Sequence, residues 1–174
     1  TCSAITVAEE MRDYFKQMGI EQRVLIVASP NVQDNFKSQL FDESKLENID
    51  GIWNIKSCTG TKLIKEVNPM NTKNIEKGHI VKQVNNIIKD SYKFMGYVKL
   101  ANKINELSKI DKNLSMRKNK RQIKARLKKE FDDNLLIIDE IHNIRLSDNE
   151  SNSKKLVVKA LKTLVDNVDN MRLL

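Results

Sequence analysis

Two adjacent carboxylates follow one of the most apolar stretches of the chain. Residues 135–138 (Leu-Leu-Ile-Ile) form a continuous apolar run of strand length, and Asp139 and Glu140 come directly after it. Phosphoryl transfer uses such a pair, because one carboxylate holds Mg²⁺, directly or through water, while the other orients and polarises the attacking water. A β-strand would place the two side chains on opposite sides, where they can do different work. The alternative is an Asp-Glu pair that ends a strand by chance.

A sheet must position these carboxylates, and the sequence predicts strands and helices in alternation. The runs at 23–28 and 135–138 are typical of parallel strands covered on both faces, and we expect them to be neighbouring or near-neighbouring central strands. Shorter strands are expected at 52–55, 92–98 and 172–174. Apolar residues at helical spacing predict helices at 2–18, 32–41, 80–88, 100–107, 118–131 and 156–168. The alternation indicates an α/β fold, a mostly parallel sheet with helices on both faces, whose ligands bind beyond the carboxyl ends of the strands. Residues 61–78 and 147–153 are expected to be polar and irregular.

The positive charge of the chain is concentrated in one block. The formal net charge is +8, and residues 99–130 hold 12 Lys or Arg against three Asp or Glu. The rest of the chain holds 19 basic and 20 acidic residues and is therefore almost neutral. A basic block of this kind attracts polyanions, above all nucleic acid. The alternative is a solvated helical face.

Cysteine and histidine are too few and too scattered to indicate a metal site. Cys2 and Cys58 have no short spacing, and His79 and His142 are far apart. The pattern predicts neither a disulfide scaffold nor a zinc site, and it fits a reducing, intracellular compartment. No apolar run approaches the ~20 residues that span a bilayer, so no membrane partner is expected.

Four segments of the chain resemble motifs of the DExH-type helicases of superfamily 2. Residues 139–142 (Asp-Glu-Ile-His) after their apolar run match motif II. The strand at 24–28 ends in Ser29-Pro30 and is followed in the sequence by a helix. This arrangement resembles motif Ia, a loop that lies along the nucleic acid in that family. Residues 1–4 (Thr-Cys-Ser-Ala) resemble the stretch after the Gly-Lys of a Walker A loop, and residues 172–174 resemble the strand that leads into motif III.

This resemblance implies that residues 1–174 are part of a first RecA-like domain, a three-layer fold incomplete at both ends, with a basic helical insertion at about 99–130. It implies ATP and Mg²⁺ as cofactors, with Glu140 and Asp139 catalytic and the Thr1 hydroxyl and Asp139 on the metal. His142 would couple the nucleotide state to motif III and to a second RecA-like domain of the same full-length chain. That second domain and the Walker A Gly and Lys residues lie outside these 174 residues, which alone are expected to be inactive.

A finer resemblance links residues 53–60, 92–97 and 139–145 to the helicase-like ATPases of large cytoplasmic DNA viruses. These include the poxvirus-type early transcription factor and nucleoside triphosphatase I. It implies transcription machinery as a partner, and the host cytoplasm or virion as the location. A turn at 57–60 and a packing role for Tyr97 are the alternatives to nucleic-acid contact at those positions. The candidate nucleic-acid contacts are Ser29, Pro30, Thr59, Gly60, Tyr97, Arg117, Lys118, Lys120 and Arg121.

Three functions agree with these features. The first is a motor that couples Mg-ATP hydrolysis to movement on DNA or RNA. The second is a nucleic-acid-stimulated ATPase that acts in viral transcription without separating strands. The third is a non-enzymatic nucleic-acid-binding module, which the intact Asp139 and Glu140 disfavour.

Overall fold

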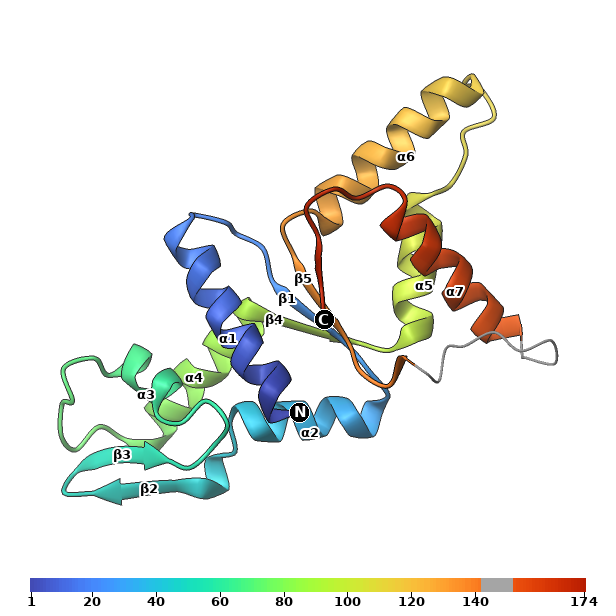
Figure 1. Cartoon of the computed structure of the whole chain (residues 1–174). Coiled ribbons are helices and arrows are strands. Elements are labelled where there is room, and N and C mark those ends of the chain that lie inside the picture. The colour runs from blue at the N-terminus through green and yellow to red at the C-terminus, as the bar shows by residue number, and fades with distance from the viewer. Residues whose placement is uncertain (142–151) are drawn as a thin grey trace. The chain divides into compact units, whose positions relative to one another are not determined.

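A computed structural model describes the backbone of residues 1–141 and 152–174 and the side chains of 1–141 and 155–174. The described chain forms two compact units, which are treated separately. Unit 1 holds residues 1–24 and 30–93, and unit 2 holds residues 25–29 and 94–174. Figure 1 shows the elements in chain order: α1 (Cys2–Gln17), β1 (Val24–Val27), α2 (Pro30–Leu40), the short 3-10 helix Glu43–Lys45, β2 (Leu46–Ile49), β3 (Ile52–Ile55), α3 (Lys62–Val67), α4 (Lys77–Ser91), β4 (Tyr92–Met95), α5 (Tyr97–Leu107), α6 (Met116–Phe131), β5 (Leu135–Ile138), α7 (Asn152–Val165) and β6 (Arg172–Leu173).

The central sheet is parallel and has the strand order β4-β1-β5-β6. All four residues of β1 are buried, as are the first three of β5. The backbone N–H of Asp139 donates to the carbonyl of Val27 over 3.1 Å, which holds the end of β5 beside β1. The prediction that the two apolar runs are neighbouring or near-neighbouring central strands is confirmed, since they are direct neighbours, and the α/β fold class is confirmed as well.

The core of unit 2 lies between this sheet and three helices (Figure 1). Burying each aliphatic side chain contributes about 1.5–3 kcal/mol, so this cluster is the main source of stability in the unit. It comprises Leu25 and Val27 of β1, Met95, Leu136 of β5, Leu100, Ala101 and Ile104 of α5, Leu127 and Phe131 of α6, and Val157, Ala160 and Leu164 of α7.

Unit 1 contains a hairpin that the sequence analysis did not predict. Strand β3 lies where it was expected, but it pairs antiparallel with β2, with Ile49 opposite Ile52. The turn between them is Asp50-Gly51, and both residues have positive φ, 52° and 84°. Asp-Gly is a typical sequence for such a two-residue turn because Gly meets no Cβ penalty there. A Cβ at Gly51 would also lie 2.9 Å from the Asn74 side chain. Both the positive φ and this close approach therefore favour glycine at position 51.

Several predicted boundaries differ from the structure, and three of the differences have a clear local reason. Helix α2 begins at Pro30 rather than at 32, because proline's fixed φ and missing N–H suit the first helical position. The strand expected at 92–98 stops at Met95, because Gly96 becomes the N-cap of α5 and Tyr97 its first residue. Residues 61–78 are not irregular throughout: they include α3, whose Leu63 and Ile64 are buried. The polar loop expected at 147–153 falls largely outside the described residues.

Candidate functional site

Strand β5 delivers Asp139 to the carboxyl end of the sheet, between two neighbouring strands. The Ile138 N–H donates to the carbonyl of Leu174 over 3.0 Å, and the Asp139 N–H donates to Val27 over 3.1 Å. The backbone at this point is therefore held from both sides. In parallel sheets this edge is where ligands bind.

Asp139 and Glu140 lie in a turn, which corrects the expectation that strand alternation separates them. The strand ends at Ile138, and Glu140 has a φ of 55°, in the left-handed region. Asp139 Oδ1 accepts the backbone N–H of Glu140 over 3.0 Å. The Asp139 side chain is half-buried and the Glu140 side chain is exposed. The two carboxylates thus have different surroundings, which is what two different roles require.

Tyr97 is tied to this turn. Its hydroxyl donates a hydrogen bond to the backbone carbonyl of Asp139, and its ring packs against the core of unit 2. Burial raises the pKa of Tyr97, and the negative charges of Asp139 and Glu140 raise it further. The ring therefore has the packing role that was the alternative to nucleic-acid contact. The contact between Tyr97 and nucleic acid stays a prediction.

The acidic turn fits a magnesium ion that is bound together with a nucleotide. Mg²⁺ is usually held by one or two carboxylates plus substrate phosphates and waters, not by a cage of protein ligands. Among the described residues no group of three or more His, Cys, Asp or Glu forms such a cage. One Asp139 oxygen is engaged by the Glu140 N–H, and the other carries no hydrogen bond within the described part of the chain. That second oxygen is suited to a metal or to a metal-bound water.

The remaining residues assigned by resemblance are only partly placed. Thr1 precedes α1, and its Oγ1 accepts a 3.4 Å hydrogen bond from Asn35 of α2. Ser29 and Pro30 are exposed where β1 passes into α2. Thr1 belongs to unit 1 and Asp139 to unit 2, so a metal site shared by the two stays a prediction. His142 lies outside the described residues.

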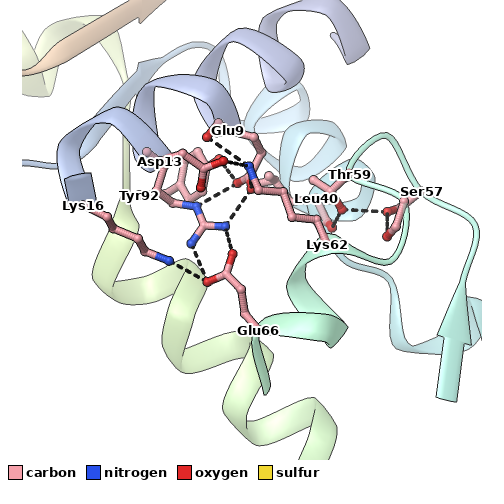
Figure 2. A network of polar contacts seen from close by, with 11 residues as sticks. Glu9, Asp13, Lys16, Leu40, Ser57, Thr59, Lys62, Glu66 and Tyr92 are labelled. Atoms are coloured by element: carbon pink, nitrogen blue, oxygen red, sulfur yellow. Dashed lines mark hydrogen bonds and ion pairs between the residues drawn. The ribbon is translucent and has the colours of Figure 1, made fainter. Parts of the chain in front are cut away.

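The segment at 57–60 is a closed turn (Figure 2). The Ser57 and Thr59 hydroxyls lie 2.8 Å apart, and Thr59 donates to the Leu40 carbonyl over 3.2 Å. The Gly60 N–H donates to the Ser57 carbonyl over 3.0 Å, and Gly60 has a φ of 56°. The two hydroxyls therefore stabilise the turn itself, which agrees with the alternative that residues 57–60 form a structural turn. Phosphate contacts from Thr59 and Gly60 stay predictions.

Cys58 of this turn forms a disulfide with Cys2 at the start of α1. The two Cα atoms are 5.3 Å apart, within the range that a disulfide spans. The sequence predicted no disulfide scaffold, and this single disulfide corrects that expectation. Their separation of 56 positions carried no signal, because only the fold brings the turn to the start of the helix.

A buried ionic network in unit 1 was also missed by the sequence analysis (Figure 2). Arg12 and Glu9 of α1 are only 3% and 4% exposed. The Arg12 guanidinium donates to both oxygens of Glu9, over 3.1 and 2.7 Å, and to the carboxylate of Glu66 in α3. The Tyr92 hydroxyl donates to Glu9 from the other side. Ionic side chains on the buried face of a helix cannot be told from exposed ones by apolar periodicity alone.

Electrostatics couples this network tightly. Burial raises the pKa of Glu66, but hydrogen bonds from Arg12 and Lys16 outweigh it and bring the pKa down to about 2. Burial and the adjacent Glu9 carboxylate raise the pKa of Tyr92. A pocket of about 570 Å³ lies beside the network, lined by Asp13, Lys16, Thr59, Thr61, Lys62, Lys65 and Glu66. Because Lys16 pairs with Glu66 and Lys62 with Asp13, two of its cations are neutralised within the network.

Some basic side chains of the block form ion pairs and others do not. Near the C-terminal end of α6, Lys124 and Lys128 pair with Asp169. In the first half of the helix four basic side chains are exposed, and none forms an ion pair with a described residue: Arg117, Lys118, Lys120 and Arg121. Between α5, α6 and α7 lies a groove of about 850 Å³ that also carries Lys112 and Lys159. The first half of α6 thus presents four exposed positive charges close together in the chain.

No protein-family model, curated protein or solved structure matches the chain. None of the helices in the described residues combines the length and the apolar character needed to cross a bilayer.

Proposed function

We propose that this chain is part of the nucleotide-hydrolysing domain of an ATP-dependent motor that moves on DNA or RNA. The fold would be a three-layer, RecA-like domain. The observation that carries the proposal is the placement of Asp139 and Glu140 directly after the buried strand β5, beside β1, at the carboxyl edge of a parallel sheet. The resemblance of residues 139–142 to motif II agrees with this placement.

In this function the two carboxylates act differently. Asp139 would hold the magnesium ion of bound Mg-ATP through the carboxylate oxygen that does not accept the Glu140 N–H, and the ion would supply charge stabilisation for the phosphates. Glu140, which is exposed at the turn, orients the lytic water and takes up its proton. The Walker A residues and the second RecA-like domain would be supplied by the rest of the full-length protein.

Nucleic acid would be held by positive charge outside the hydrolytic site. The exposed, unpaired cations of α6 offer nonspecific contacts to phosphates. Ser29 and Pro30 follow β1 at the carboxyl edge of the sheet, where the resemblance to motif Ia expects them to face the nucleic acid.

The test is a pair of substitutions in the full-length protein. Glu140→Gln keeps the shape of the side chain but removes the proton acceptor, so steady-state ATP turnover should fall by about 10²–10⁴-fold while nucleotide and nucleic-acid binding persist. Asp139→Asn should weaken the affinity for nucleotide when Mg²⁺ is present. If Glu140→Gln hydrolyses ATP at the wild-type rate, the residues are not a Walker B box, and the non-enzymatic binding module becomes the better account.

A further inference from the structure

We propose that Tyr97 is a positioning residue for the hydrolytic turn, because it holds the peptide plane between Asp139 and Glu140. The inference rests on the proposed function. Tyr97 begins α5, and its hydroxyl reaches a carbonyl 42 positions further along the chain.

Both sides of that peptide plane are engaged. Its carbonyl, which belongs to Asp139, accepts the Tyr97 hydroxyl. Its N–H, which belongs to Glu140, donates to Asp139 Oδ1 over 3.0 Å. The strand side is fixed as well, because the Asp139 N–H donates to Val27 over 3.1 Å. Every backbone polar group between the two carboxylates is therefore held by a hydrogen bond.

The held conformation is one that glutamate adopts only under constraint. Glu140 has a φ of 55°, in the left-handed region, which carries an energetic cost for a residue with a Cβ. Rotation of the preceding peptide would relieve this cost and would re-aim both carboxylates. The Tyr97 hydroxyl opposes the rotation because it would lose its acceptor. The Tyr97 hydrogen bond thus keeps the strained backbone of Glu140 in place, where the two carboxylates need a fixed geometry.

Tyr97 is suited to this role by its own surroundings. Its ring packs against the core cluster of unit 2, so the hydroxyl is presented from a rigid element rather than from a flexible side chain. The same contact links the start of α5 to the turn after β5.

Tyr97→Phe removes the hydroxyl and keeps the ring. We expect kcat for ATP hydrolysis in the full-length protein to fall by about 10–100-fold, because a small displacement of reacting groups has effects of this size. The KM for Mg-ATP should change by no more than about twofold, since bound phosphates would be held mainly by other residues. A residue that only stabilises the fold would instead lower the number of nucleotide-binding molecules and leave kcat per bound site unchanged.

The experiment compares Tyr97→Phe with Tyr14→Phe, a matched change on the exposed side of α1, where Tyr14 is 38% exposed. Turnover is expressed per nucleotide-binding site, measured by equilibrium titration, so that partial unfolding does not imitate the result. Glu140→Gln is assayed in parallel. If Tyr97→Phe keeps the wild-type kcat per site while Glu140→Gln is inactive, the positioning role of Tyr97 is overturned and the proposed function still holds. An active Glu140→Gln overturns the proposed function itself.

Discussion

Arg12 and Glu66 are 54 positions apart in the chain, yet the Arg12 guanidinium donates to both oxygens of the Glu66 carboxylate in the folded protein, one of these bonds measuring 2.9 Å. The same guanidinium is paired with Glu9, and it is almost inaccessible to solvent. One side chain therefore ties α1 to α3 and pairs with two carboxylates, one of which, Glu9, is buried.

Removing this guanidinium should destabilise the protein strongly. Arg12→Met takes the closest cation from the buried Glu9 carboxylate and leaves Lys62 Nζ 3.5 Å away, so the loss should approach the value of about 3–5 kcal/mol for breaking a buried pair. Urea unfolding followed by circular dichroism measures the loss. The control is Lys16→Met, because the Lys16 side chain is 54% exposed and its pair with Glu66 is a surface pair, with an expected cost below about 1 kcal/mol. Equal losses in the two variants would contradict the network described for α1.

The Glu66 contribution should depend on pH. The pKa of Glu66 is lowered from 4.5 to about 2, so its stabilising effect is complete above about pH 4.5 and is lost as the pH falls toward 2. The shift corresponds to about 3 kcal/mol, and solvent screening of the 24%-exposed side chain reduces it to about 2 kcal/mol. Glu66→Gln should therefore differ more from wild type at pH 7 than at pH 3 in unfolding free energy.

The matched control for Glu66→Gln is Asp34→Asn, since Asp34 pairs with Lys37 at the surface and its side chain is 74% exposed. Its effect should stay within about 0.5 kcal/mol at both pH values. A Glu66→Gln difference of the same size at pH 7 and pH 3 would show that the carboxylate is not held ionised by Arg12.

The exposed half of α6 should carry nonspecific nucleic-acid affinity. Changing its four free cations to Gln should weaken binding to duplex DNA and reduce the salt dependence, because each lost phosphate contact lowers the slope of log K against log salt by about 0.9. Fluorescence anisotropy at several salt concentrations measures both quantities. The control removes the same charge from exposed positions in and next to α4, namely Lys73, Lys77, Lys82 and Lys89. Identical slopes for the two fourfold variants would mean that α6 is merely a solvated face.

Reduction of the Cys2–Cys58 disulfide should lower the stability of the protein. The bond closes a loop of 56 positions, and a cross-link over such a loop stabilises by about 2–4 kcal/mol. Thermal unfolding with and without dithiothreitol measures the effect. Cys58→Ser should unfold like the reduced protein and should not respond to the reductant. Two titratable thiols in the oxidised wild type would argue against the bond.

Much of the sheet could be predicted from the sequence, because its central strands leave a strong local signal. Continuous apolar runs identified β1 and β5 as neighbours, and the position of Asp139 after β5 followed from the same run. The hairpin β2–β3 could have been found too, since Asp50-Gly51 is a turn signal between two apolar pairs. It was missed because only β3 was considered as a strand.

The polar connections could not be predicted. Tyr97 meets Asp139, and Arg12 meets Glu66, only after distant elements pack together. Nothing in the local sequence distinguishes a tyrosine or an arginine at the surface from one that is buried. The disulfide escaped for the same reason, because the distance between Cys2 and Cys58 is set by the packing of α1 against the turn at 57–60.

The strand order has a consequence for the timing of folding during synthesis. Strand β1 is made before both of its neighbours in the sheet, since β4 and then β5 follow it in the chain. The β2–β3 hairpin and the packing of α3 against α4 can form during synthesis, because their residues are close in the chain. The middle of the sheet can form only after β5 has been synthesised. Until β5 emerges, the apolar residues of β1 lack one neighbouring strand and stay exposed on the nascent protein.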